Sequence, residues 1–376
     1  MTLMADPAIL PQALNLSGQH RSAEVLINLG ALAHNIHWIQ RRVGPRCMVM
    51  AVVKADGYGH GTKEIASAAL AAGACALGVA TSDEALALRE TQGFEATPIL
   101  VMAPTLPSEA EPLQRAGVGV AVGSNLVLQT HLNVARRLGV PARLHVQLDT
   151  GIGRDGFRFS DFSWLDLLSS APECLEAMFT HFAVADGLSP EDFEFTELQF
   201  SRFIDGAQRV REAGHEPILH AANSGAILRH HGMECHFVRP GMMLYGVDPS
   251  GHRLPEDPLQ PVLTLRSRLA AIREMEAGDT ISYARTFTVP SHRRIGIVPL
   301  GYGDGFPVAF SNKGHVLLHG RPAPIRGRVC MDQFMIDLSD HPAAVLGDEV
   351  VIYGEQNGAS IRLEDCLLYT SDAADE

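Results

Sequence analysis

One lysine of this chain, Lys54, stands where an apolar run ends and a glycine-rich loop begins. Residues 48–53 are apolar, and residues 55–61 read Ala-Asp-Gly-Tyr-Gly-His-Gly. A buried strand that ends in a lysine and opens into such a loop can present one amine to a ligand. Because a desolvated lysine amine is easily neutralised, it can act as a nucleophile toward an aldehyde. A lone lysine at a strand end more often extends its charge into solvent, but the sequence around Lys54 favours the reactive amine.

Other residues with chemical potential follow later apolar runs. Asn223 and Ser224 follow one run, and Arg239 lies within Phe-Val-Arg-Pro-Gly at the end of another. Residues 151–156 formally match the G-x-G-x-x-G pattern of dinucleotide-binding loops. That loop does not open a strand–helix–strand unit, and no acidic strand end follows it suitably. We therefore predict no dinucleotide site there.

The elements that must position these residues alternate between short apolar runs and helical segments. This alternation predicts parallel β/α units, and eight units in about 200 residues predict a TIM-type (β/α)8 barrel of the α/β class. The predicted strands are 48–54, 77–80, 99–102, 118–122, 144–148, 177–182, 219–222 and 237–238, and the clearest helices are 63–72, 82–91, 125–138 and 191–213. In such a barrel the chemistry lies at the C-terminal strand ends, where this sequence has Lys54, Asp149, Arg154, His181, Asn223, Ser224 and Arg239.

The character of the sequence changes after the barrel. Residues 248–261 are rich in proline and polar residues, as linkers are, and residues 262–361 show short alternating runs separated by turn residues. The last residues resemble the translation of a sequencing adapter. We therefore predict a flexible tail over 1–22, a barrel over 23–250, an incomplete, mostly β domain over 251–365 and a non-native tail over 366–376.

Composition argues against several classes of partner. The net charge is −13 without a block of like charges, which argues against nucleic acid and against a basic membrane-binding helix. No apolar run approaches the roughly 20 residues of a membrane span, and residues 1–20 lack the pattern of a signal peptide. The six cysteines are scattered, and no cluster has metal-ligand spacing. We predict a cytoplasmic protein without a metal, membrane or nucleic-acid partner.

Residues 51–61 resemble, position by position, the cofactor-lysine signature of the alanine racemase family. Further motifs follow in that family's order over about residues 23–365. The resemblance implies a barrel with a C-terminal β domain, and pyridoxal 5′-phosphate (PLP) held by Lys54 through a Schiff base. It also implies an isomerase that interconverts L- and D-alanine and supplies D-alanine for cell-wall peptidoglycan.

The resemblance also assigns a cofactor pocket. The loops after strands seven and eight of a barrel often hold a phosphate. By position alone, Ser224 is equally compatible with an ordinary helix N-cap. The residues that match the family's cofactor contacts, besides Lys54, are Tyr58, His181, Asn223, Ser224, Arg239, Gly241 and Met242.

Arg239 matches the residue beside the cofactor's pyridine nitrogen. A guanidinium is always charged and cannot accept a proton from that nitrogen. The ring nitrogen then stays largely unprotonated, so the cofactor is a weaker electron sink and side reactions such as transamination are disfavoured. PLP enzymes of other types commonly place a carboxylate there. The alternative, a surface salt bridge, is not typical of an arginine at a strand end.

Racemisation needs a base on each face of the Cα–H bond. Lys54 serves one face, and the family pattern matches Tyr283, in Ile-Ser-Tyr, to the second base. His181 and Arg239 then form the hydrogen-bond chain behind Tyr283. A lone tyrosine here would more often be a strand aromatic. In the family this tyrosine comes from the second subunit, so the resemblance implies a C2 homodimer with shared active sites.

Three further residues match the family's substrate pocket. Arg154, in Asp-Thr-Gly-Ile-Gly-Arg, matches the arginine that binds the substrate carboxylate, a task that suits a guanidinium fork. Tyr302 matches a residue that narrows the channel to the site, and Met331 one whose backbone amide helps to hold the carboxylate. Many family members carry a carbamylated lysine at the position of Gln147, and a neutral amide would orient Arg154 more weakly than an anion.

Together these motifs predict a PLP-dependent racemase that acts on alanine. The alternatives are a broad-specificity amino-acid racemase, a non-catalytic PLP-binding barrel and a decarboxylase on the same architecture. Non-catalytic barrels lack the β domain, and a decarboxylase would have a carboxylate in place of Arg239. The family's β domain continues past the position of Asp365 to a tyrosine that contacts the cofactor phosphate. A chain cut there should therefore retain PLP less well.

Overall fold

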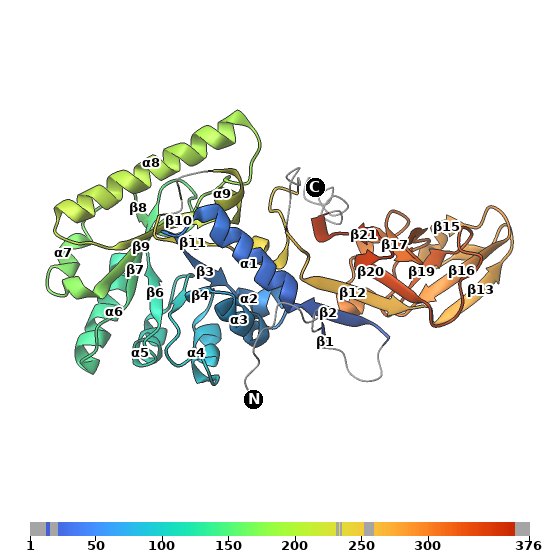
Figure 1. The fold of residues 1–376 in the computed structure, drawn as a ribbon, viewed down its shortest axis with the longest axis horizontal. Coiled ribbons are helices and arrows are strands. Elements are labelled where there is room, and N and C mark those ends of the chain that lie inside the picture. The colour runs from blue at the N-terminus through green and yellow to red at the C-terminus, as the bar shows by residue number, and fades with distance from the viewer. Residues whose placement is uncertain (1–12, 16–21, 231–232, 234, 252–258, 365–376) are drawn as a thin grey trace. The chain divides into compact units, whose positions relative to one another are not determined.

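The computed structural model describes residues 13–15, 22–230, 233, 235–251 and 259–364 (Figure 1). The chain forms two compact units. The barrel unit comprises Gly30–Gln260, and the β unit combines the segment that ends at Leu29 with the chain from Pro261 onward.

The barrel unit is built on eight parallel strands that close into a ring. Each strand pairs with its neighbours along the chain, and the last strand pairs back with the first. The ring consists of β3 (Met48–Val52), β4 (Ala76–Val79), β5 (Ile99–Val101), β6 (Gly119–Val122), β7 (Leu144–Asp149), β9 (Leu175–Phe179), β10 (Ile218–Asn223) and β11 (Phe237–Arg239), while β8 (Phe157–Arg158) adds to β7. The helices of this unit are α1 (Leu29–Val43), α2 (Lys54–Gly59), α3 (Thr62–Ala71), α4 (Ser82–Glu90), α5 (Ala110–Arg115), α6 (Asn125–Leu138), α7 (Leu165–Leu168), α8 (Pro190–Glu212) and α9 (Ser224–Arg229). The predicted (β/α)8 barrel is confirmed.

Local sequence explains these elements. Barrel strands are covered on both faces and therefore read as continuous apolar runs; β4 and β6 are buried at every position. Helix α8 begins with a capping box, in which the Ser189 hydroxyl oxygen accepts from the Asp192 N–H and the Asp192 carboxylate accepts from the Ser189 N–H. Helix α6 ends at Gly139, whose φ of 70° suits glycine.

The described residues of the β unit form three sheets. The largest runs β1-β2-β12-β20-β17-β18 with β21 on β20, a second runs β13-β16-β19, and β14 pairs with β15. The strands are β1 (Ala13–Asn15), β2 (Glu24–Asn28), β12 (Leu263–Arg268), β13 (Ala271–Met275), β14 (Thr280–Ile281), β15 (Phe287–Thr288), β16 (Arg293–Val298), β17 (His315–Leu318), β18 (Arg321–Pro324), β19 (Phe334–Asp337), β20 (Glu349–Gln356) and β21 (Ala359–Ile361). The predicted mostly β domain after the barrel is confirmed.

Strand β2 departs from the predicted domain boundary. It pairs antiparallel with β12, with Ile27 opposite Leu263. Residues 24–28 therefore belong to the β unit, whereas the sequence analysis assigned them to the barrel. A five-residue strand with three apolar residues in a row carries no local signal of a partner so far along the chain. Within the predicted N-terminal tail, β1 pairs with β2, and the predicted tail 366–376 lies outside the described residues.

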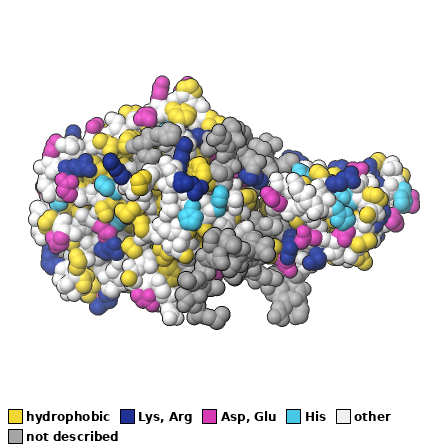
Figure 2. Space-filling model, in the orientation of Figure 1, with side chains coloured by type: hydrophobic (Ala, Val, Ile, Leu, Met, Phe, Trp, Pro, Cys, Tyr) yellow, Lys and Arg dark blue, Asp and Glu magenta, His cyan; other side chains and the backbone are white. Residues whose placement is uncertain are grey.

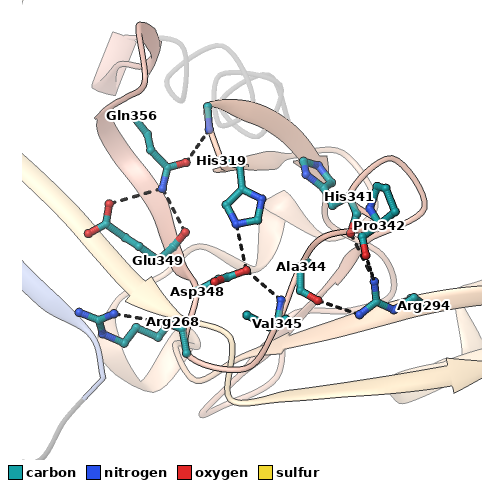
Figure 3. A network of polar contacts seen from close by, with 12 residues as sticks. Arg268, Arg294, His319, His341, Pro342, Ala344, Val345, Asp348, Glu349 and Gln356 are labelled. Carbon is teal, nitrogen blue, oxygen red and sulfur yellow. Dashed lines mark hydrogen bonds and ion pairs between the residues drawn. The ribbon is translucent and has the colours of Figure 1, made fainter.

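The β unit has its own core, and polar contacts hold the loops around it (Figure 3). The Asp348 carboxylate accepts hydrogen bonds from His319 Nε2 (2.9 Å) and from the Val345 N–H (2.8 Å). These bonds fix the loop that leads into β20. The buried core includes Val298, Val316, Phe334, Ile336 and Val350.

Charged side chains of both signs are interspersed on the face of the molecule that Figure 2 shows. Among the described helices, none is long and apolar enough to cross a membrane. The described residues also contain no group of three or more His, Cys, Asp or Glu side chains that could hold a metal ion.

A buried histidine makes the barrel unit sensitive to acid. His131 on α6 is 1% exposed, and it shares hydrogen bonds of 3.0 Å with Thr105 Oγ1 and Gln114 Nε2. Burial lowers its pKa to about 4. As the pH falls below about 6.5, His131 becomes protonated in the unfolded chain but stays neutral in the folded chain. The free energy of unfolding therefore declines until the pH reaches about 4.

We therefore expect His131→Gln to flatten the pH dependence of stability. Between pH 7 and pH 5 the wild type should lose about 2 kcal/mol of unfolding free energy through this one residue. Urea titrations of the two proteins at both pH values would measure the change in midpoint. An identical shift in wild type and variant would contradict this role of His131.

Candidate active site

Lys54 lies at the start of a left-handed turn directly after β3. Residues 55–58 have φ between 52° and 61° and ψ between 38° and 53°. Each such conformation costs about 1–2 kcal/mol for a residue other than glycine, and Gly57 alone of the four escapes this penalty. The sequence predicted a glycine loop here, and the structure has a strained turn instead.

Hydrogen bonds to two carboxylates offset the strain of this turn. The Ala55 N–H donates to Glu84 Oε1 (2.6 Å), and the Thr62 N–H donates to Asp56 Oδ1 (2.9 Å). Glu84 also accepts from the Ala80 N–H (2.7 Å), which ties the turn to the end of β4. Because a strained conformation persists only where its surroundings hold it, the backbone at Lys54 is fixed before any ligand binds.

Tyr58 ends the turn and lies close to Lys54. Its ring centre is 5.9 Å from Lys54 Nζ and 4.8 Å from the ring of Tyr245. Tyr245 donates to the carbonyl of Val52 on β3 (3.2 Å) and so anchors both rings. A Cβ at Gly241 would lie 2.5 Å from the Tyr58 hydroxyl oxygen. That hydroxyl therefore approaches the loop after β11 at a point where only glycine leaves room.

Ser224 faces the same loop. Its Oγ accepts hydrogen bonds from the N–H groups of Gly241 (3.0 Å) and Met243 (3.4 Å). Asn223, not Ser224, caps helix α9, because Asn223 Oδ1 accepts from the Ala226 N–H (3.1 Å). The structure thus brings Ser224 to the loop after β11 and gives Asn223 the capping role that was the alternative for Ser224.

Arg239 is buried at the end of β11 and is bound by neutral acceptors. Nη1 donates to Nδ1 (2.7 Å) and the carbonyl (2.8 Å) of His220, and Nη2 donates to the carbonyls of Thr180 (2.7 Å) and Ala221 (3.0 Å). Burial lowers the pKa of Arg239 to about 10. Arg239 forms no ion pair with a carboxylate in the described part of the chain, and its burial rules out the surface salt bridge considered as an alternative. Nε makes no hydrogen bond to a described residue, which leaves one donor for a ligand.

His181 lies just after β9, within the influence of three cationic side chains. Burial and the charges of Arg239, Arg154 and Lys54 hold its pKa at about 3, so its imidazole is neutral near neutral pH. Its ring makes no hydrogen bond to a described residue, and Arg239 binds His220 instead of joining a chain with His181. His181, Arg239, Arg154 and Lys54 nevertheless lie at one end of the barrel, because each ends or follows a strand of the same parallel ring.

Asp149 organises the loop after β7. Its Oδ1 accepts hydrogen bonds from the N–H groups of Gly151 (3.0 Å) and Gly153 (3.1 Å). A Cβ at Gly156 would lie 2.8 Å from the Asp149 backbone nitrogen. The glycines of the G-x-G-x-x-G match thus serve this turn, which carries Arg154 exposed.

Among the described residues, Gln147 makes its side-chain hydrogen bond to the loop backbone and none to Arg154. Its Nε2 donates to the carbonyl oxygen of Asp155 (2.9 Å), the residue next to Arg154. The expected orientation of Arg154 by the Gln147 amide oxygen is therefore replaced by support of the loop backbone. A lysine carbamate could bind the guanidinium directly, whereas this shorter neutral side chain satisfies the nearest carbonyl.

The β unit carries the remaining candidates on neighbouring loops. Tyr283, Met331 and Tyr302 are 69%, 55% and 49% exposed. The Gly303 N–H donates to the Met331 carbonyl (2.8 Å), and a Cβ at Gly301 would overlap that same oxygen. The glycines around Tyr302 therefore let its loop pack backbone to backbone against the Met331 loop.

Tyr283 emerges from strained backbone beside a pocket. Its neighbours Ser282 and Ala284 have φ of 67° and 60°, and Ser282 Oγ donates to the Arg328 carbonyl (2.6 Å). Tyr283 and Met331 line a pocket of about 520 Å³ in the β unit. The Tyr283 hydroxyl makes no hydrogen bond to a described residue. Strain held in place at an exposed polar side chain is typical of functional sites.

Two buried residues of this site were not found by sequence analysis. His220 accepts the hydrogen bond of Arg239, and Tyr245 packs against Tyr58. His220 lies inside an apolar strand, where a single polar residue is a signal of function. The sequence does not show which way the His220 side chain points, because that depends on how the barrel closes. Tyr245 follows the last strand and had no motif to mark it.

Family models match almost the whole chain. The model for the alanine racemase N-terminal domain matches residues 27–249, and that for the alanine racemase C-terminal domain matches residues 262–373. A curated relative from Halothermothrix orenii, an alanine racemase, is 38% identical over 344 residues, which are 90% of this chain and 89% of the relative.

Solved structures resemble the fold over the same extent. Alanine racemase from E. faecalis superposes with a TM-score of 0.85 at 32% identity and covers 94% of each chain. Alanine racemase from Bartonella henselae, whose structure has covalently bound pyridoxal phosphate, superposes with a TM-score of 0.80 at 26% identity and covers 94% of each chain.

Proposed function

The chain belongs to the alanine racemase family, and on that premise we propose how its own residues interconvert L- and D-alanine with PLP. As a member of this family it is a PLP-dependent isomerase. The observation that carries the assignment of residues is the place of Lys54, Arg154 and Arg239, each at or just after the C-terminal end of a strand of one closed parallel barrel. An amine, a carboxylate-binding guanidinium and a buried guanidinium at one barrel end suit an amino-acid substrate on an aldehyde cofactor.

The described residues fit PLP at three points. Lys54 supplies the amine for the aldehyde. Arg239 has a buried guanidinium whose Nε lacks a partner among the described residues, which suits the pyridine nitrogen, a single acceptor. The Tyr58 hydroxyl and the Ser224 hydroxyl meet at the loop of Gly241, and hydroxyl and amide donors of this kind hold phosphate oxygens. Met242 adds its backbone amide to this group, and Asn223 fixes the helix that carries Ser224.

PLP, when bound, withdraws electrons from the α-carbon of an amino acid and makes its α-proton acidic. Lys54 holds the cofactor through Nζ and, once released by the substrate amine, carries the α-proton on one face. Tyr283 carries the proton on the opposite face. Arg239 is a permanent donor and keeps the pyridine nitrogen from gaining a proton, which favours return of the α-proton over side reactions. His181 is a neutral polar neighbour of Lys54, Arg154 and Arg239.

We propose that the partner's Tyr283 completes each site in a C2 homodimer. The exposure of Tyr283, its unused hydroxyl and the adjoining pocket support an interface on this face of the β unit. In a two-fold dimer each copy gives its tyrosine and receives one. The Met331 amide then joins Arg154 in holding the substrate carboxylate, and Tyr302 narrows the channel.

Removal of Arg154 should weaken turnover far more than removal of Gln147. We expect Arg154→Ala to lower kcat/KM for alanine by about 10²–10³-fold, because the substrate carboxylate loses a charge-assisted pair. Gln147→Ala should cost less than about tenfold, since it loses one neutral hydrogen bond to the Asp155 carbonyl. Steady-state kinetics in both directions measures the difference, and equal losses would argue against the assignment of Arg154.

The proposed function is tested with single amino acids. Purified protein loaded with PLP is incubated with each L-amino acid, and the D-enantiomer is measured by chiral chromatography. D-Alanine should dominate; comparable rates for several amino acids would indicate a broad-specificity racemase instead. Absence of any D-amino acid from the loaded protein would refute the proposal.

We also propose that the enzyme works in the cytoplasm and supplies D-alanine for peptidoglycan. Expression in a bacterial strain that depends on added D-alanine tests this role. Growth without the supplement is expected, and a Lys54→Ala variant should not support it. Failure of the wild-type protein to restore growth, despite activity in vitro, would count against the biosynthetic role.

A further inference from the structure

A chain of polar contacts runs through the barrel interior from Arg239 to a carboxylate. Arg239 Nη1 lies 2.7 Å from His220 Nδ1, and His220 Nε2 lies 3.1 Å from His145 Nδ1. His145 Nε2 in turn lies 3.9 Å from Glu176 Oε1. His145 and His220 are buried, and each histidine uses both of its ring nitrogens within the chain.

The direction of the hydrogen bonds in this chain is fixed by its two ends. Arginine only donates, so His220 Nδ1 must accept. A neutral imidazole with an acceptor at Nδ1 carries its proton on Nε2, so His220 donates to His145 Nδ1. By the same reasoning, His145 carries its proton on Nε2, which faces Glu176. Every donor from Arg239 onward therefore points toward the carboxylate.

The surroundings keep Glu176 and His220 in the protonation states that this direction requires. Arg143 binds Glu176 through two bonds, Nε to Oε2 (2.7 Å) and Nη2 to Oε1 (2.6 Å). Burial raises the pKa of Glu176, but His145 and Arg143 outweigh it and hold the pKa at about 2, so Glu176 is an anion. Burial and Arg239 hold the pKa of His220 well below its usual range, so His220 is neutral.

We propose that His145 and Glu176 are positioning residues for Arg239, which act by fixing the tautomer of His220. If His145 carried its proton on Nδ1, that proton would oppose the one on His220 Nε2. His220 would then move its proton to Nδ1, where it would face the Nη1 donor of Arg239. One bond that aligns the guanidinium would be lost.

This inference rests on the proposed function in one respect, the pairing of Arg239 with the cofactor's pyridine nitrogen. A less constrained Arg239 would protect that nitrogen from protonation less well, and the loaded enzyme would transaminate more often. In that side reaction the amino group of alanine stays on the cofactor as pyridoxamine phosphate, and pyruvate leaves after addition of one water. The ratio of pyruvate to D-alanine formed therefore reports the alignment of Arg239.

Four substitutions separate positioning from simple support of the fold. His145→Phe interrupts the chain of polar contacts, and Glu176→Gln removes the negative charge at the end of that chain. His145→Gln is the conservative rescue, because its amide can accept from His220 and donate to Glu176. Arg143→Met is the matched control: it breaks the ion pair, but a glutamate without a partner is also an anion at neutral pH, so the Glu176 charge still faces His145.

The first readout needs no cofactor. The full-length apoprotein is prepared with ¹⁵N-labelled histidine, and the His220 signals are assigned by their absence from the spectrum of His220→Asn. Long-range proton–nitrogen NMR then reports which ring nitrogen of His220 carries the proton. The wild type, His145→Gln and Arg143→Met should show the proton on Nε2. His145→Phe and Glu176→Gln should lose this single tautomer.

The second readout uses the loaded enzyme. The ratio of pyruvate to D-alanine should rise about tenfold in His145→Phe and Glu176→Gln, and stay within about twofold of wild type in the other two variants. The proposal would be overturned if His145→Phe and Glu176→Gln kept the wild-type tautomer of His220 and the wild-type ratio of pyruvate to D-alanine. It would also be overturned if Arg143→Met changed both quantities as much as those two variants do. If the wild-type enzyme formed no D-alanine, the proposed function would be refuted. The NMR of the apoprotein would still test whether His145 and Glu176 fix the tautomer of His220.

Discussion

Replacement of Lys54 with alanine should abolish racemisation. We expect kcat for D-alanine formation to fall by at least about 10⁴-fold, because the variant loses both the amine that holds the cofactor and the base on one face of the substrate. The visible absorbance of bound PLP should also be lost after gel filtration. Both effects are measured on protein whose circular dichroism matches that of the wild type.

Lys63 provides the matched control for this experiment. It is an exposed lysine on α3, within the same segment of chain but outside the strained turn. Lys63→Ala should keep wild-type kinetics and wild-type absorbance. Residual activity of Lys54→Ala above about one hundredth of wild type would show that another group supplies the base.

Tyr283→Phe should slow racemisation by about 10²–10⁴-fold while the ring stays in place. Loss of one base should also make hydrogen exchange unequal. In deuterated water, Lys54 should still exchange the α-hydrogen of one alanine enantiomer, whereas the other enantiomer should exchange slowly. Mass spectrometry of L- and D-alanine incubated separately with the variant measures this asymmetry.

Mixed dimers test whether Tyr283 serves the partner's site. A dimer of one Lys54→Ala subunit and one Tyr283→Phe subunit has one site with both bases intact if the tyrosine crosses the interface. An equal mixture, unfolded and refolded together, should therefore recover up to about a quarter of wild-type activity. No recovery would mean that each subunit uses its own tyrosine. Tyr302→Phe, on the neighbouring loop, is the control and should cost less than about tenfold.

Much of the barrel could be predicted because its signals are local. Each strand is a short apolar run, helices α4, α6 and α8 have side-chain N-caps, and the residues after the strands share one end of a parallel barrel by necessity. That reasoning predicted Lys54, Arg154, His181 and Arg239 at one end of the barrel, and in the structure they lie at or after the ends of β3, β7, β9 and β11. It also predicted Ser224 as a site residue, and the Ser224 hydroxyl oxygen accepts a hydrogen bond from the Gly241 N–H.

Other features of the site could not be predicted, because they depend on contacts between residues that are far apart in the sequence. The left-handed turn after Lys54 is held by Glu84, a residue of another strand–helix unit. The partner of Arg239 is His220, because closure of the barrel points both side chains inward. Gln147 supports the Asp155 carbonyl rather than Arg154, a choice set by side-chain length and loop path.

The pairing of β2 with β12 also governs how the chain is made. Strand β2 leaves the ribosome before the barrel, but its partner is translated only after roughly 230 further residues, which take roughly 10–50 s at about 5–20 residues per second. During that time the edge of β2 that β12 later covers has no partner, and an exposed strand edge of this kind can pair with other nascent chains. The barrel can complete itself in the interval, so the β unit is the last part to close. Aggregation during expression should therefore depend on translation speed between β2 and β12 more than on the stability of the finished enzyme.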